Sequence, residues 1–172
     1  ETYGLENDKS TGDAIRRNIE ENFLAEIYEG VKRDQFAGNI GFKQDVVSKA
    51  AVVLDTQPTT QQMIDFVMQN GTRYASTAKG YAWCTGGNVL AQVVDQVTRD
   101  GFGTESAMGY NSIWPENFLE TAQNLNGYTG ISEEDNLLKN PKFIKMLKIY
   151  TPTRLAGRRR ANIGDDAGTA VD

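Results

Sequence analysis

The sequence contains no histidine and only one cysteine among its 172 residues. Without histidine the chain lacks the commonest general base at neutral pH and the commonest metal ligand, so a Ser–His–Asp triad, a Cys–His dyad and a histidine-based zinc site are all excluded. The single thiol, Cys84, allows no disulfide within the chain and no thiolate zinc site, and a lone thiol is most often a small buried side chain. The composition therefore predicts a protein that is not an enzyme and that holds no metal ion.

Motifs for nucleotides and membranes are also missing. No GxxxxGK or GxGxxG pattern occurs, and the closest approach, Gly101 and Gly103, lacks the third glycine and a preceding strand, so no cofactor is expected. No apolar run approaches the roughly 20 residues of a membrane span, and no signal peptide pattern is present. We expect a soluble mature chain of undetermined compartment. Because it begins at Glu1 without methionine, it is interpreted as a processed protein or as an excerpt of a longer one.

Apolar residues recur at helical spacing along most of the chain. The longest such segment covers residues 11–34, and Ser10 followed by Asp13 predicts its start as a capping box. Its apolar face is formed by Ile15, Ile19, Phe23, Leu24, Ile27, Tyr28 and Val31. Further helices are predicted over residues 44–54 (where a strand is also compatible), 59–70, 89–101, 114–125 and 141–150, with a short helix after Ser132.

Two segments depart from this helical pattern. Residues 72–84 are interpreted as a helix of small residues or as a loop, and residues 100–112, rich in Gly and Ser, as an exposed loop. No segment alternates with a period of two, and no internal repeat occurs. We therefore predict an all-α fold, a single-domain bundle of about six or seven helices over residues 1–150. An N-terminal arm is expected at residues 1–10 and a flexible or partner-docking tail at residues 151–172.

The charge is distributed unevenly along the chain. Its net value is −5, yet residues 139–160, here called the basic segment, contain eight basic side chains and no acidic one. These side chains are Lys139, Lys142, Lys145, Lys148, Arg154, Arg158, Arg159 and Arg160. Such a segment folds back on its own body, docks on an acidic neighbour or holds a polyanion. The lysines lie opposite the apolar face, as on any surface helix, whereas the arginine triplet follows the last helix and can reach a partner.

Two partners are compatible with the basic segment. One is nucleic acid, whose phosphates it would neutralise while Tyr74, Tyr81 or Trp83 stacks on the bases, although the net negative charge opposes this. The other is a second copy of the chain, because the first predicted helix presents an acidic counter-surface. That counter-surface is formed by Glu20, Glu21, Glu26 and Glu29. An acidic head and a basic tail favour head-to-tail contacts, which close into rings or continue as filaments.

Aromatic residues give a weaker indication of binding. Several lie in segments expected to be loops or arms, where they serve as core plugs or as interface anchors. They are Tyr3, Phe36, Phe42, Phe102 and Tyr110.

The predicted function is a non-enzymatic structural subunit of a larger assembly, by analogy of fold and composition a viral or phage coat or connector protein. Its partners would be copies of itself or other subunits. A subunit of a bacterial secretion or conjugation machine and a nucleic-acid-binding helical module are alternatives. The enzyme alternative is a helical glycoside hydrolase that uses Glu105 with a second carboxylate such as Asp100, although 23 acidic residues make such a placement common by chance.

Overall fold

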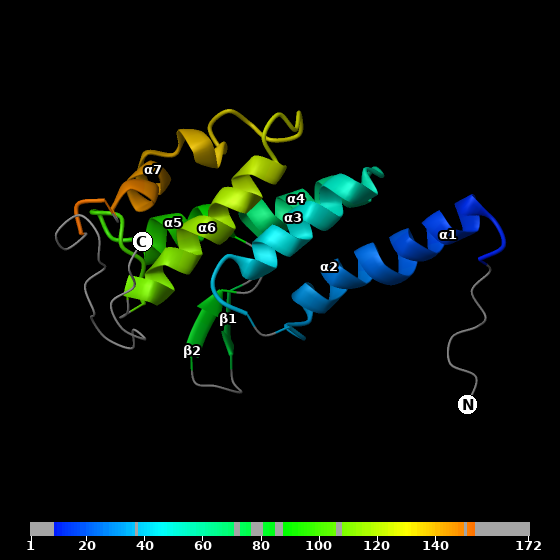
Figure 1. The fold of residues 1–172 in the computed structure, drawn as a ribbon, viewed down its shortest axis with the longest axis horizontal. Coiled ribbons are helices and arrows are strands. Elements are labelled where there is room, and N and C mark those ends of the chain that lie inside the picture. The colour runs from blue at the N-terminus through cyan, green and yellow to red at the C-terminus, as the bar shows by residue number, and fades with distance from the viewer. Residues whose placement is uncertain are drawn as a thin grey trace.

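The computed structural model describes residues 9–36, 38–70, 73–76, 81–84, 88–105, 108–149 and 151–153. Within these ranges the chain forms a bundle of seven α-helices with one β-hairpin at its side (Figure 1). The elements are α1 Gly12–Ile19, π-helical η1 Glu20–Leu24, α2 Ala25–Lys32, α3 Phe42–Leu54, α4 Thr59–Asp65, π-helical η2 Phe66–Asn70, β1 Arg73–Ser76, β2 Tyr81–Cys84, α5 Val89–Gln96, α6 Met108–Asn124, 3-10 helix η3 Leu137–Lys139 and α7 Pro141–Lys148. The predicted helical bundle is confirmed. Most of the predicted arm at 1–10 and most of the tail at 151–172 lie outside the described residues.

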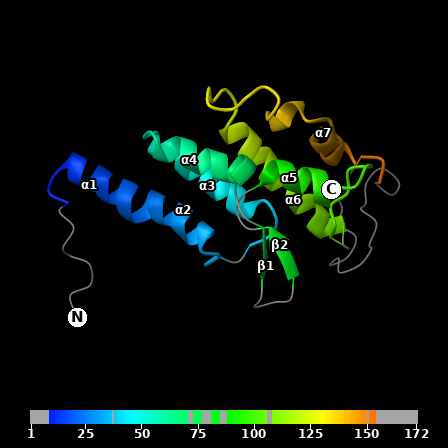
Figure 2. The ribbon, with the colours of Figure 1, turned by 180° about the vertical axis from the view of Figure 1, so that it is seen from behind.

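The long N-terminal helix is built from α1, η1 and α2. The helix starts one residue later than the capping box at Ser10 predicts. Thr11 is the N-cap, and its Oγ1 accepts a hydrogen bond from the Ala14 amide at 3.1 Å. The helix is interrupted by η1, whose wider π-helical turn shifts the rotational phase of the side chains that follow. Figures 1 and 2 both show α1 extending past the other helices at one end of the molecule. None of the residues of α1 is buried.

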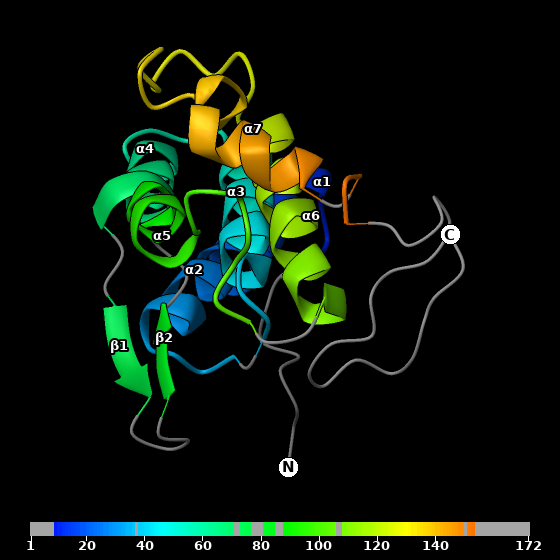
Figure 3. The same ribbon diagram turned by 90° about the vertical axis from the view of Figure 1, so that its left-hand side faces the viewer.

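The core is centred on α3. Seen along the bundle, α3 lies between α4 and α6, with α2 on a further side (Figure 3). Trp114 and Phe118 of α6 and Val47 of α3 are almost completely buried in it. The helical interpretation of residues 44–54 is confirmed and the strand alternative is wrong.

A polar network is buried within the contact between α3 and α6. Asn124 Nδ2 donates to Asp45 Oδ1 and to Ser48 Oγ, both at 3.1 Å. The Ser48 hydroxyl in turn donates to the Asp45 carbonyl at 2.8 Å. Asp45 and Ser48 are both buried, so these bonds replace the water that the two side chains lost on folding.

Helix α6 begins earlier than predicted. Its first residue is Met108, so Trp114 and Pro115 lie inside the helix and are buried, not at its mouth. The preceding loop is also less exposed than expected, since Gly101 and Gly103 are buried. A Cβ at Gly103 would lie 2.6 Å from Asn111 Oδ1 and 3.1 Å from the Trp114 ring, so the absence of a side chain permits this close approach.

The β-hairpin corrects the interpretation of residues 72–84 as a helix or loop. Strands β1 and β2 are antiparallel, with Tyr74 paired to Trp83 and Ala75 to Ala82. Each strand has four residues, which is too short for an alternating pattern to stand out from the surrounding sequence.

None of the helices in the described ranges is long and apolar enough to cross a membrane.

Candidate interaction surface

The lysines of the basic segment contact the chain's own body. Helix α7 starts where Asn140 Oδ1 accepts the amide of Phe143 at 3.1 Å, and it packs on α5 and α6. Lys142 Nζ donates to the carbonyl of Val94 in α5, and Lys145 Nζ donates to the carbonyl of Arg99 at 3.3 Å. These bonds tie the start of the basic segment to the segment that ends α5.

The remaining basic residues divide into two groups. Lys139 forms an ion pair with Glu133 on the preceding turn, and Lys148 is exposed. The arginines lie outside the described residues, so their predicted role as partner contacts stays a prediction. They are Arg154, Arg158, Arg159 and Arg160.

The acidic counter-surface is also partly engaged within the chain. Glu29 forms ion pairs with Lys32 at 2.8 Å and with Arg33 at 3.5 Å. The hydrogen bond from Lys32 to Glu29 raises the pKa of the Lys32 ammonium, which shows how closely these two charges are coupled. Within the described part of the chain, Glu20, Glu21 and Glu26 form no ion pair. The four predicted glutamates are therefore not equivalent.

Among the described residues, no ion pair joins the acidic counter-surface to the basic segment. The four glutamates lie on η1 and α2, whereas the described lysines of the basic segment lie on η3 and α7 (Figures 1 and 2).

The most prominent uncovered feature is an apolar face on α1 and η1, which we call the N-terminal apolar face. It consists of Ile15, Ile19 and Phe23, whose side chains are 45%, 48% and 61% exposed. The apolar residues continue along the helix, where Leu24 at the end of η1 and Val31 on α2 are buried against the bundle. The apolar residues of one long helix thus have a covered half and an uncovered half.

A groove continues from this face onto the body of the protein, and we call it the aromatic groove. Its volume is about 380 Å³, and Phe23, Phe36 and Phe42 stand around it. Phe36 and Phe42 are 45% and 43% exposed. A Cβ at Gly30 would lie 2.3 Å from the Phe36 ring, so this glycine allows Phe36 to lie directly on α2. A glycine inside an apolar helix was the available sequence signal for this packing, and sequence reasoning missed it.

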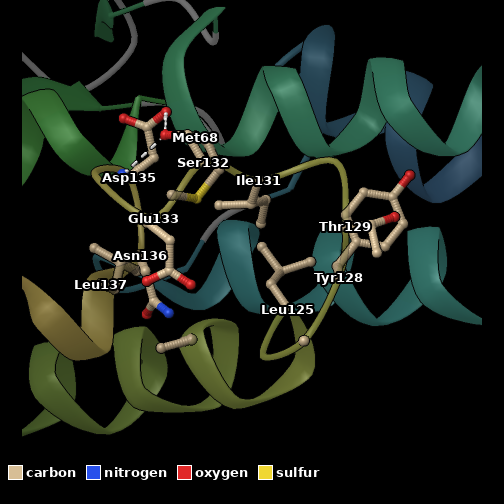
Figure 4. A pocket seen from close by; sticks show the side chains of 12 residues that line it. Met68, Leu125, Tyr128, Thr129, Ile131, Ser132, Glu133, Asp135, Asn136 and Leu137 are labelled. Atoms are coloured by element: carbon tan, nitrogen blue, oxygen red, sulfur yellow. Dashed lines mark hydrogen bonds between the residues drawn. The ribbon is translucent and has the colours of Figure 1, made fainter.

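A second cavity, of about 260 Å³, lies between η2, the end of α6 and the loop that follows it (Figure 4). Met68, Leu125 and Ile131 form its apolar side. Its acidic side chains already have partners, because Asp135 accepts hydrogen bonds from Gln69 and from Ser132, both at 2.8 Å. These bonds hold the loop against the bundle and leave the Asp135 carboxylate engaged.

The two carboxylates of the hydrolase alternative lie in the loop between α5 and α6. Glu105 and Asp100 line neither the aromatic groove nor the second cavity. Asp100 lies 3.7 Å from the guanidinium of its neighbour Arg99, and both side chains are largely exposed. A search of the described residues found no group of three or more Cys, Asp or Glu side chains placed to hold a metal ion.

Comparisons with protein-family models, with curated protein sequences and with solved structures gave no significant match for this chain. The function is therefore argued from the surfaces described above. Of these, the N-terminal apolar face and the aromatic groove present large apolar side chains, each at least 43% exposed: Ile15, Ile19, Phe23, Phe36 and Phe42.

Proposed function

We propose that the chain is a non-enzymatic subunit of a larger assembly and that it binds copies of itself through the N-terminal apolar face. The observation that supports this most strongly is the exposure of Ile15 and Ile19 on α1, which has no buried residue, and of Phe23 on the η1 turn that follows. Contiguous apolar surface with a polar rim is typical of protein–protein contacts.

The energetics of α1 favour a partner. Helices gain most of their stability in proteins from packing an apolar face, and α1, the first part of the long N-terminal helix, buries no residue against the described part of the chain. Fully burying one Ile or Phe side chain contributes roughly 1.5–3 kcal/mol. Covering three partly exposed side chains would therefore stabilise both α1 and the contact that covers it.

The finer assignments stay predictions. A viral or phage coat or connector protein follows from composition and fold by analogy, and a subunit of a secretion or conjugation machine follows equally. Head-to-tail contact through the basic segment, or binding of nucleic acid there, depends on Lys148 and on arginines outside the described residues. The apolar contact proposed here requires neither of them.

The test is the mass of the purified chain by light scattering after size exclusion, over a range of concentrations. We expect the wild-type chain to form multimers and Phe23→Ser to remain a monomer, because Phe23 is the most exposed side chain of the face. The matched control is Val94→Ser, since Val94 is 64% exposed but lies on α5, away from α1. A wild-type chain that stays monomeric throughout would contradict the proposal, as would equal assembly of all three proteins.

A further inference from the structure

We infer that two copies of the chain pair through α1 and η1 in antiparallel orientation, about a two-fold axis that passes beside Ile19. This inference rests on the proposed self-association and specifies its geometry. It follows from the order of the residues on both sides of Ile19, which is self-complementary when the helix is reversed against a copy of itself.

The apolar side chains are arranged symmetrically around Ile19. Ile15 lies four residues before it and Phe23 four residues after it, so in a regular α-helix each would be rotated from Ile19 by about 40°. Because the π-helical turn of η1 advances less per residue than an α-helix, Phe23 shifts towards the flank of Ile15 and stays on the same face of the helix. In an antiparallel pair centred at Ile19, Ile19 meets its own copy and Ile15 of the second copy meets Phe23. The stripe is about 12 Å long from Ile15 to Phe23.

One flank of the stripe carries a basic residue before Ile19 and an acidic residue after it, so the two would meet in an antiparallel pair. Arg16 and Glu20 lie on the same side of Ile19, rotated from it by about 60° and about 100°. Both belong to the side chains without an ion pair in the described ranges. In an antiparallel pair with two-fold symmetry, each flank meets the same flank of the second copy. Arg16 then lies beside Glu20 of the second copy, and this ion pair forms twice.

The other flank is also self-complementary. It carries Asn18 and Asn22, whose amides are already linked within the helix by a hydrogen bond of 3.2 Å. Across the axis they would face the same two amides of the second copy, and amide groups both donate and accept. In a parallel pair each flank would instead meet the opposite one, so Arg16 and Glu20 would face these amides and lose their ion pairs. Charge complementarity therefore favours the antiparallel pair.

The aromatic groove extends this contact. Ile15 of the second copy meets Phe23, which stands at the edge of the groove beside Phe36 and Phe42. A stable interface buries about 1,600 Å² in total, more than a three-residue stripe provides, and the groove supplies additional apolar area. Because the same surface is used by both copies, the contact closes into a dimer and leaves the opposite end of each chain free.

Disulfide trapping tests the position of the axis in the full-length chain, with Cys84→Ser removing the native thiol. Ile19→Cys places two thiols at the axis, where their Cα atoms can approach the roughly 4.4–6.8 Å that a disulfide needs. Asp13→Cys is the control, because residue 13 lies six residues from the axis and the two copies would be about 18 Å apart there. We expect rapid cross-linking at position 19 and little at position 13. Equal or faster cross-linking at position 13 would overturn the inference.

Charge reversal tests the orientation. Arg16→Glu or Glu20→Arg alone should weaken dimerisation about tenfold, because each replaces two ion pairs by two like-charge contacts, and the double variant should restore it. Arg17→Glu and Glu21→Arg are the matched controls, since they make the same changes at i and i+4 on the opposite face of the helix and should leave the dissociation constant unchanged. Equal weakening by Arg16→Glu and Arg17→Glu would overturn the inference.

The outcomes separate the inference from the proposal beneath it. A multimer that shows neither cross-linking at position 19 nor rescue by the double charge variant would keep the assembly function and reject the two-fold pairing. A chain that is monomeric under all conditions would reject both.

Discussion

The N-terminal apolar face and the contact between α3 and α6 are built from the same kind of pattern but have opposite surroundings. On α3, Val47 and Ala51 are four residues apart and completely buried. On α1, Ile15 and Ile19 are also four residues apart, yet each is almost half exposed. Apolar spacing therefore predicts which side of a helix will be covered, but the covering element has to be supplied by the rest of the fold or by another molecule.

The difference between the two regions has a simple structural cause. Helix α3 has 13 residues and α6 has 17, and they pack along each other in the middle of the bundle. Helix α1 lies beyond the end of the bundle, so no described helix is placed opposite its apolar face (Figures 1 and 2). Substitutions in the two regions should consequently affect different measurements, stability in one case and association in the other.

The largest effect is expected for Phe118→Ala in α6. Phe118 is completely buried, so the variant loses its transfer free energy and leaves a cavity that the surrounding helices fill only partly. The free energy of unfolding should fall by about 3–5 kcal/mol, measured by denaturant unfolding. Phe23→Ala is the matched control, and under monomeric conditions it should lower this free energy by less than about 0.5 kcal/mol, because Phe23 is exposed. Similar losses in both variants would contradict the distinction between the two regions.

A smaller effect is expected for Asn124→Ala. This variant removes both hydrogen bonds from the Asn124 amide and leaves the buried Asp45 carboxylate with one partner fewer. We expect the free energy of unfolding to fall by about 1–3 kcal/mol. Gln123→Ala, one residue away on the exposed side of α6, should change it by less than about 0.5 kcal/mol. An unchanged stability of Asn124→Ala would show that water replaces the amide in this network.

A gain of stability is expected for Gln92→Met in α5. Gln92 is completely buried, and neither its Nε2 nor its Oε1 has a hydrogen-bond partner in the described part of the chain. Methionine has a similar shape without the cost of an unsatisfied amide, so the free energy of unfolding should rise by about 1 kcal/mol. The exposed Gln62 serves as control, and Gln62→Met should leave stability nearly unchanged. A loss of stability in Gln92→Met would mean that the Gln92 amide has a hydrogen-bond partner beyond the described residues.

The sequence predicted the helices whose signals are local. The periodic segment at residues 11–34 and the helix that starts at residue 141 could be predicted because helical spacing depends on neighbouring residues. The start of α6 at Met108 was missed because Trp114 and Pro115 suggested a helix start, although a buried neighbourhood accommodates Pro115 inside the helix. Asn88 occupies the N-cap position of α5 in a left-handed conformation without a side-chain cap bond.

The candidate surface could be predicted only in part, because it depends on contacts between residues far apart in the sequence. Phe36 and Phe42 were flagged as plugs or anchors from their place in a loop, but the groove they form depends on the contact of Phe36 with Gly30 and on the approach of α3. The bond from Lys142 to Val94 joins residues 48 positions apart, so no local pattern indicates it. Contacts of this kind require the tertiary fold. The spacing of the charged residues around Ile19, in contrast, follows directly from the sequence.

The smallest expected change in the stability of the single chain, and the sharpest test of the comparison, is that of Ile19→Ser. Isoleucine and serine have similar helix propensities and Ile19 is 48% exposed, so the unfolding free energy of the monomer should change by less than about 0.5 kcal/mol. If a second copy covers the face, the wild-type unfolding temperature should rise with protein concentration, because dimerisation stabilises the folded state by mass action. The Ile19→Ser unfolding temperature should not depend on concentration. Calorimetry of both proteins over a hundredfold concentration range measures this. If the two unfolding temperatures respond to concentration in the same way, no second copy covers the face in solution.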